Sequence, residues 1–210
     1  MDSKKHIAAV IRLLRKAYPE LKCGLNFGDP FQLLVATILS AQTTDALVNR
    51  ITPALFRKYR TVRDFAASDP EQLAKDLSLV NFYNNKSRNI RSASIMIMEK
   101  FSGNVPKTME ELVMLPGVAR KTANIILYNA FGINEGIAVD THVIRLSNRL
   151  GLTNHSDPKK IEQDLISITP KKEWGDLTHL LISHGRAVCQ ARKPMHEKCV
   201  LSDICPSNDI

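Results

Sequence analysis

The sequence lacks any stretch in which apolar and polar residues alternate for long enough to predict a convincing β-strand. The one candidate, residues 136–139, is short. Apolar residues recur at helical spacing instead, between cap and turn signals, as in residues 31–39 after Asp29 and Pro30. We therefore expect an all-α protein.

Long hydrophobic runs, low-complexity segments, internal repeats and linkers are also absent. The longest uncharged run, residues 30–44, is too short to span a bilayer. Near the N-terminus, Arg12, Arg15 and Lys16 interrupt the apolar pattern, so no signal-peptide core is present. We expect an intracellular, cytoplasmic protein with no membrane-spanning segment.

The chain has little acidic charge relative to basic charge. Its 210 residues carry a formal net charge of +8, which favours a polyanionic partner, either nucleic acid or an anionic membrane surface. A chain of this length can bury one substantial core or two small ones. Because no linker separates two blocks of sequence, two lobes would require the chain to cross between them more than once.

Residues 115–124 form the segment around which the chain is organised. Pro116 and Gly117 predict a tight turn, and Thr108 with Glu111 predicts a capping box that opens a short helix ending near Met114. The apolar residues after the turn indicate a second helix. The pattern predicts helix, five-residue hairpin and helix, whose backbone N–H groups suit a phosphate. The alternative is a turn without a ligand.

Other helices are predicted from similar signals. One should run through residues 47–51 and another should follow Pro53, while residues 68–71 read as a second capping box. Residues 80–85 are expected to form a polar-aromatic loop. Further helices are expected from residue 90, from residue 140, from residue 157 and over residues 174–184.

Lys121 and Asp140 form the candidate catalytic pair. An amine must be uncharged to act as a nucleophile, and both the helix N-terminus and the neighbouring Arg120 disfavour the charged form of Lys121. A carboxylate within reach could accept the proton or stabilise a developing cation. The alternative is that Lys121 contacts phosphate and Asp140 only caps its helix.

Cysteine is scarce and unevenly placed. Cys23 stands alone, whereas Cys189, Cys199 and Cys205 lie close together near the C-terminus. In a reducing compartment this clustering indicates a metal site rather than disulfides.

Residues 115–124, followed by residues 138–142, resemble the helix–hairpin–helix and following Asp loop of endonuclease III, a bifunctional DNA glycosylase that removes oxidised pyrimidines. Residues 39–45, 82–86 and 182–186 are similar to family segments in the same order, so the resemblance covers nearly the whole chain. It implies a two-lobed fold. Residues 23–134 would form a helical barrel lobe with the hairpin, and residues 1–22 and 135–210 a second lobe with a metal loop over 189–205.

The resemblance also implies an activity. Lys121 would attack the sugar C1′, displace the damaged base and form a Schiff base that permits β-elimination, while Asp140 would assist. A lysine at this position favours a glycosylase with AP lyase activity over a monofunctional mismatch or adenine glycosylase. The alternatives are a related glycosylase specific for mispaired thymine or uracil, and a non-catalytic helix–hairpin–helix DNA-binding protein.

Double-stranded DNA with damaged bases or abasic sites is the implied partner, and the protein would act on it as a monomer associated with the nucleoid. Flipping a nucleotide costs a few kcal/mol. By similarity Gln42 would fill the gap and Phe82 would wedge against the opposite strand. Their alternatives are a helix terminator and a loop aromatic folded onto the core. The DNA-binding hairpin residues would be Leu115, Pro116, Gly117, Val118 and Ala119.

Cys189, His196, Cys199 and Cys205 match the spacing of the family's four-cysteine loop for a [4Fe–4S] cluster, with His196 in place of the second cysteine. Three Cys and one His would also suit zinc, and an empty loop is the remaining alternative. Arg192 and Lys193 lie between the first two ligand positions and would form a basic loop that contacts DNA phosphates. Binding should weaken steeply with salt.

Overall fold

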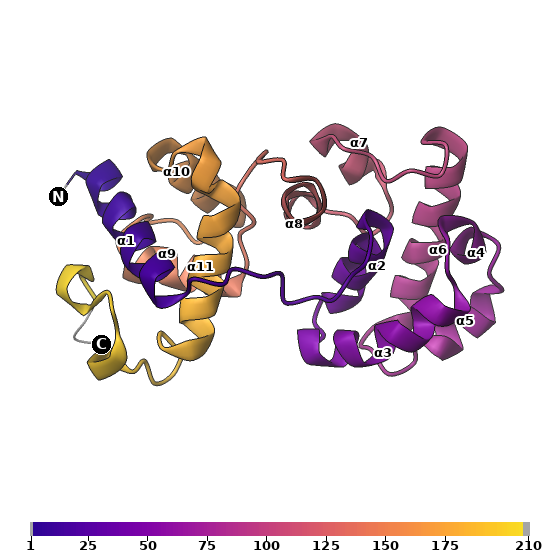
Figure 1. The fold of residues 1–210 in the computed structure, drawn as a ribbon, viewed down its shortest axis with the longest axis horizontal. Helices are drawn as coiled ribbons and strands as arrows, with labels where there is room; N and C mark the ends of the chain where they lie inside the picture. Colours follow the sequence, from indigo (N-terminus) through magenta and orange to yellow (C-terminus); the bar gives the residue numbers. More distant parts are fainter. Residues whose placement is uncertain (1, 208–210) are drawn as a thin grey trace. The chain divides into compact units, whose positions relative to one another are not determined.

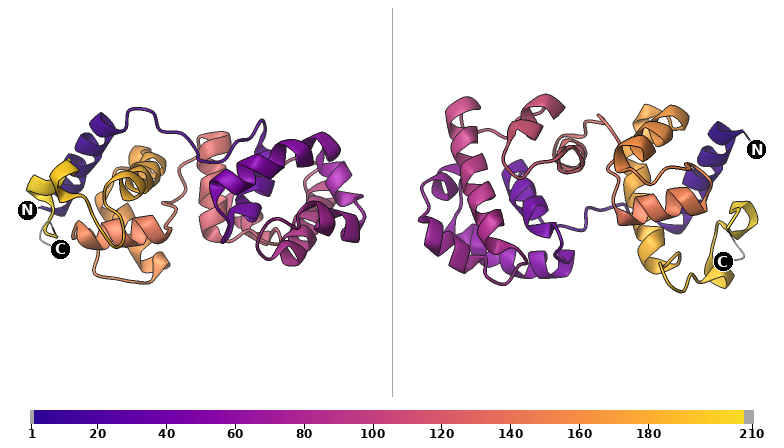
Figure 2. Two further views of the ribbon diagram at one scale, coloured as in Figure 1. Left: turned by 90° about the horizontal axis from the view of Figure 1, so that it is seen from below. Right: turned by 180° about the vertical axis from the view of Figure 1, so that it is seen from behind.

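The structure, a computed structural model, describes residues 2–207, and all of the regular secondary structure in these residues is helical (Figures 1 and 2). These residues contain no strand, so the expectation of an all-α fold is confirmed. None of the helices in residues 2–207 combines the length and apolar character needed to cross a membrane. The chain forms two compact units, one made of Met1–Lys22 and Asn134–Ile210 and the other of Cys23–Ile133.

The unit Cys23–Ile133 is built around α2. Asp29 caps this helix through a bond from the Gln32 N–H to its carboxylate (2.8 Å), and Pro30 takes the first position. Because α2 is apolar on nearly every side, it is buried and packs against α3, α6 and α8. The helices of this unit are α2 (Pro30–Ser40), α3 (Asp45–Lys58), α4 (Val62–Ala66), α5 (Pro70–Asp76), α6 (Tyr83–Lys100), α7 (Met109–Met114) and α8 (Arg120–Phe131).

The other unit has its own core, in which α11 packs against α1 and α9. Gly185 in α11 permits this close approach, because a Cβ there would lie 2.8 Å from His142 Nδ1 of α9. Residues 136–139 are buried, but they form no strand. The elements are α1 (Ser3–Ala17), α9 (Thr141–Arg149), α10 (Pro158–Ile168), η1 (Lys171–Glu173), α11 (Trp174–Ala187), η2 (His196–Lys198) and η3 (Ser202–Ile204).

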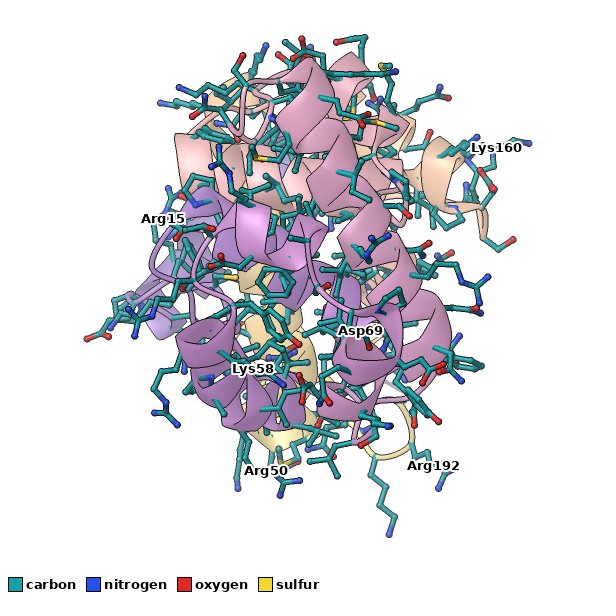
Figure 3. All side chains as sticks on the ribbon, turned by 90° about the vertical axis from the view of Figure 1, so that its right-hand side faces the viewer. Arg15, Arg50, Lys58, Asp69, Lys160 and Arg192 are labelled. Carbon is teal, nitrogen blue, oxygen red and sulfur yellow. The ribbon has the colours of Figure 1, made fainter. Side chains whose placement is uncertain are left out.

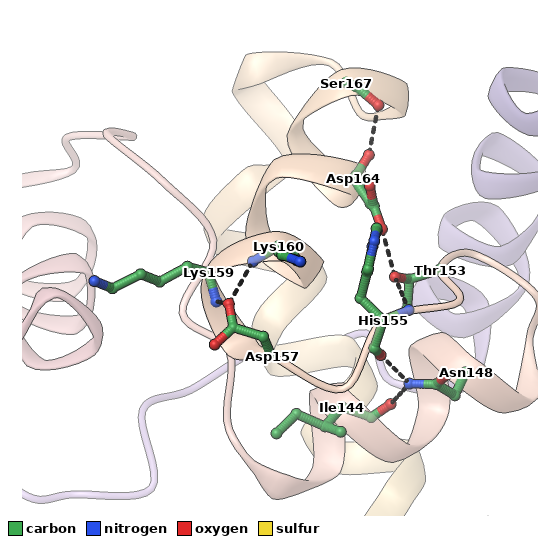
Figure 4. Close-up of polar contacts among 9 residues, drawn as sticks. All are labelled: Ile144, Asn148, Thr153, His155, Asp157, Lys159, Lys160, Asp164 and Ser167. Atoms are coloured by element: carbon green, nitrogen blue, oxygen red, sulfur yellow. Dashed lines mark hydrogen bonds and ion pairs between the residues drawn. The ribbon is translucent and has the colours of Figure 1, made fainter.

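A polar network fixes the loop that follows α9 (Figure 4). Asp164 of α10 accepts a hydrogen bond from the Thr153 hydroxyl, and its Oδ2 lies 2.8 Å from His155 Nδ1. The Thr153 hydrogen bond lowers the pKa of the Asp164 carboxyl. Asn148 of α9 donates to the His155 carbonyl (3.0 Å), so the C-terminal end of α9 is tied to this loop.

The predicted helix break before Pro53 is wrong, because α3 runs through this residue. Proline inside a helix removes one backbone bond and costs about 3 kcal/mol. Pro53 lies on the exposed side of α3, where water can satisfy the Asn49 carbonyl that it leaves without a helical donor. Val48 and Leu55 continue the buried face across it.

Two other boundaries also differ from prediction. The helix cap expected at Ser68 is Asp69, which accepts from the Gln72 N–H (2.8 Å). Ser68 is buried and donates instead to the Phe65 carbonyl (2.7 Å). The loop expected over residues 80–85 is shorter, because α6 begins at Tyr83.

Candidate DNA interface and active site

The hairpin between α7 and α8 exposes its backbone and buries two of its side chains. Leu115 and Val118 are 2% and 6% exposed and belong to the core of their unit. The Val118 N–H closes the turn on the Leu115 carbonyl (3.0 Å). Gly117 has a φ of +81°, and a Cβ there would lie 3.0 Å from Asn89 Cβ of α6. Leu115 and Val118 therefore anchor the hairpin, and its backbone is the part left to meet a ligand.

Lys121 lies in the first turn of α8, and its side chain is exposed. The N-cap residue of this helix, Ala119, has extended backbone and no side chain that could cap the first turn. Uncapped N–H groups and the positive end of the helix favour an anion at this position. The hairpin thus presents a primary amine directly beside a site suited to phosphate.

Asp140 caps α9. Its Oδ1 accepts hydrogen bonds from the N–H groups of His142 (2.8 Å) and Val143 (2.9 Å). The capping role considered for Asp140 is therefore present. Both bonds go to the same oxygen, so the cap does not use Oδ2. Asp140 belongs to the unit with α1 and α9, and Lys121 to the unit with α2.

Gln42 and Phe82 both lie in turns with left-handed backbone, at φ +52° and +56°. Gln42 lies in the turn between α2 and α3, and Phe82 is 61% exposed at the N-cap of α6. The alternative that Phe82 folds onto the core is therefore wrong. The Asn81 side chain donates to the Gln42 carbonyl (2.7 Å), so the two turns lie side by side. No motif in the sequence points to this contact.

The cysteine-rich tail gathers its predicted ligands around one small hollow. Cys189, His196, Cys199 and Cys205 all line it. Within residues 2–207, however, no group of three or more His, Cys, Asp or Glu side chains is placed to hold a metal ion. Arg149 of α9 also lines this hollow, and its guanidinium lies 3.2 Å from Cys189 Sγ.

His184 of α11 supports the same loop. Its Nδ1 lies 3.0 Å from the Tyr18 hydroxyl and its Nε2 lies 3.4 Å from Cys199 Sγ. With the Tyr18 hydroxyl as donor, His184 carries its proton on Nε2 and donates toward the sulfur. The side chain is 1% exposed, and burial lowers the pKa of His184 to about 4.

This depressed pKa predicts a loss of stability in acid. An unfolded histidine titrates near 6.5, so unfolding takes up a proton between pH 6.5 and about 4. The contribution of neutral His184 to the free energy of unfolding is complete above pH 6.5. It falls as the pH drops and is smaller by about 2 kcal/mol at pH 5. Urea unfolding at pH 7 and pH 5 measures it. His184→Gln should lose less stability than the wild type over this interval, and equal losses would contradict the assignment.

Comparison with known proteins shows which class of protein has this fold and this hairpin. Residues 35–171 match the family described as HhH-GPD superfamily base excision DNA repair protein. A solved structure of a trapped covalent intermediate of endonuclease III with DNA has the same fold. Its TM-score is 0.93 and its sequence identity 42%, over 99% of this chain and 98% of that chain. The fold and hairpin are those of a helix–hairpin–helix base excision repair protein.

Two curated relatives narrow this class. Endonuclease III of Synechocystis sp. is 50% identical over 208 residues, which is 99% of this chain and 95% of the relative. Endonuclease III of Bacillus subtilis is 43% identical over 206 residues, 98% of this chain and 94% of the relative. The chain belongs to the endonuclease III family of the HhH-GPD superfamily.

Proposed function

We propose that the protein excises oxidised pyrimidines from duplex DNA as a glycosylase and then cleaves the strand as an AP lyase. The observation that carries this proposal is the exposed Lys121 in the uncapped first turn of α8. A lysine is the side chain that makes a Schiff base with a sugar carbonyl. The similar endonuclease III whose structure is known as a trapped covalent intermediate with DNA supports the same chemistry.

The proposed chemistry begins at Lys121. Its neutral amine attacks C1′, and the base leaves with the electron pair of the glycosidic bond and is protonated. The amine loses a proton, the sugar ring opens and a Schiff base forms. Removal of a C2′ proton then expels the 3′ phosphate by β-elimination. Asp140 is the proposed carboxylate partner, which accepts the amine proton or stabilises positive charge at C1′.

Other residues are proposed to hold the DNA. The hairpin backbone from Leu115 to Ala119 would bind phosphate, Gln42 would fill the space of the flipped nucleotide, and Phe82 would wedge against the opposite strand. Arg192 and Lys193 are exposed in the loop after α11, and the Arg192 side chain extends outward (Figure 3). They would contact phosphates, so affinity would fall with salt. We propose action as a monomer, in the cytoplasm and on nucleoid DNA.

We also propose that the tail holds a [4Fe–4S] cluster, as the family resemblance implies. The residue types suit such a group, since three thiols and one imidazole line one hollow and Arg149 and His184 point toward two of the sulfurs, although the side chains of residues 2–207 are not placed to hold a metal ion. Cys189, Cys199 and Cys205 would be thiolate ligands and His196 the fourth ligand. The cluster would shape the loop that carries Arg192 and Lys193. The proposed base excision chemistry assigns it no step.

Iron content tests the cluster. The purified protein should contain iron and sulfide in equal amounts and absorb visible light. Cys199→Ser should lose most of the iron, whereas Cys23→Ser should keep it, because Cys23 lies in the other unit. Zinc in place of iron, or no metal in protein purified without oxygen, would contradict the assignment.

Borohydride trapping tests the activity. The wild-type protein should form a covalent adduct with DNA containing an abasic site and should release dihydrouracil and thymine glycol from duplex DNA. Base release from mispaired thymine alone would favour a mismatch glycosylase. Binding to DNA without adduct or base release would favour a non-catalytic DNA-binding protein.

A further inference from the structure

Lys86 of α6 is buried, and its ammonium group donates three hydrogen bonds to neutral acceptors. The residue is 5% exposed, and its Nζ donates to the carbonyls of Leu39 (2.8 Å) and Ala41 (2.6 Å) and to the Thr43 hydroxyl (2.9 Å). These bonds use all three donors of the ammonium. Burial lowers the pKa of Lys86. A buried cation is costly, so its position at this turn needs an explanation.

The three acceptors surround Gln42. Leu39 and Ala41 contribute carbonyls at the C-terminal end of α2, where the helix leaves carbonyls without partners and carries partial negative charge. Thr43 closes the other side of the turn. Gln42 itself has left-handed backbone, which costs about 1–2 kcal/mol for a residue other than glycine. Such a conformation persists where the surrounding structure enforces it.

The same lysine lies in the first turn of the helix that begins beside Phe82. The Phe82 carbonyl accepts the first backbone bonds of α6, from the N–H groups of Asn85 and Lys86 (3.0 Å each), as in any helix. The side chain of Lys86 therefore ties the helix that starts at Phe82 to the Gln42 turn. The hydrogen bond from the Asn81 side chain to the Gln42 carbonyl (2.7 Å) joins the Phe82 turn directly to the Gln42 turn.

This connection matters because the two side chains have little else to hold them. Phe82 is 61% exposed and Gln42 belongs to no hydrophobic core, so packing does not fix their positions. The backbone conformation of the two turns must therefore fix the positions of Gln42 and Phe82. Two groups that are held in place before binding lose less freedom when they enter DNA.

We propose that Lys86 and Asn81 are positioning residues that hold Gln42 and Phe82 as one preset unit for extrusion of the damaged nucleotide. This inference rests on the proposed function, in which these two side chains enter the duplex. Lys86 and Asn81 touch neither the substrate nor Lys121 in this role. Their effect should appear in the extrusion step and not in the chemistry that follows it.

Two DNA substrates separate these steps. In the first, an abasic site is paired within a duplex, and in the second it lies in a one-nucleotide bulge, where it is already unpaired and extrusion costs less. Single-turnover cleavage is measured on both for the wild type, Asn81→Ala and Lys86→Met. Asn85→Ala is the matched control, because Asn85 is an exposed asparagine in the first turn of α6 whose side chain accepts from Arg88 instead.

Asn81→Ala should slow cleavage of the paired substrate about tenfold, the effect of losing one hydrogen bond of about 1.4 kcal/mol, and change the bulged substrate less than about twofold. Lys86→Met should have a larger effect in the same sense, and Asn81→Gln should recover part of the rate. Because Lys86→Met can fail to fold, Thr43→Val provides a milder change at the same turn.

Equal losses on both substrates would show a merely structural role and overturn the inference. Unchanged rates for Asn81→Ala and Thr43→Val on the paired substrate would overturn it as well. A wild-type protein that cleaves neither substrate would overturn the proposed function and this inference with it. If the wild type cleaves both substrates and the variants cleave them at the same rates, the inference is overturned and the proposed function stands.

Discussion

Lys121→Ala will abolish the covalent adduct that borohydride traps on abasic DNA. Lys121 is exposed in the first turn of α8, where no side chain caps the helix, so in the proposed complex its amine would lie beside the phosphate held at the start of this helix. Without the amine no Schiff base can form, and strand cleavage should fall by about a thousandfold or more. Gel analysis of trapped complexes and single-turnover cleavage measure the two effects.

Lys121→Arg and Lys100→Ala complete this experiment. Arginine keeps the positive charge but cannot form a Schiff base, so Lys121→Arg should bind DNA and give no adduct. Lys100 is an exposed lysine at the end of α6 in the same unit, and its removal should leave the adduct intact. An adduct that survives in Lys121→Ala would assign the nucleophile to another amine.

Asp140→Asn will separate the two roles open to this residue. Asparagine caps helices about as well as aspartate, so the bonds from His142 and Val143 can be kept and stability should change by a few tenths of a kcal/mol. Loss of the carboxylate should lower base release by about 10²–10⁴-fold. Asp140→Ala should lose both functions, with a stability cost of about 1 kcal/mol.

Asp157 provides the control for this pair of variants. It caps α10 in the same unit through bonds from the N–H groups of Lys159 (3.1 Å) and Lys160 (3.0 Å), as Figure 4 shows. Asp157→Ala should cost similar stability and leave base release unchanged. If Asp140→Asn releases the base at the wild-type rate, Asp140 has no role in the chemistry and serves only to cap α9.

Local signals in the sequence predicted the elements with distinct caps. Asp29 with Pro30 and Asp157 with Pro158 mark helix starts that the structure has at α2 and α10. The short helix α4 was missed, although Thr61 and Asp64 form its capping box, because five residues carry little periodicity. The run of α3 through Pro53 depends on which side of the helix faces solvent, and this is decided by tertiary packing.

Short motifs also located the candidate site residues. They predicted the hairpin, Lys121 near the start of a helix and Asp140 at the start of the next, as the structure has them, while the catalytic roles of the two residues stay predictions. Lys86 could not be found in this way, since its three acceptors lie more than forty positions away in sequence and no motif marks a buried lysine. Nor could the pattern show that Leu115 and Val118 are part of the core.

The positions of Gln42 and Phe82 outside any core have a consequence for how this protein can change over generations. Neither side chain contributes to a core, so replacing one leaves the stability of the fold almost untouched. The turns beneath them are held by other residues and would carry a new side chain in the same place. In the DNA-contacting role proposed for them, substitution at these two positions would change what enters the duplex while the fold and Lys121 stay the same.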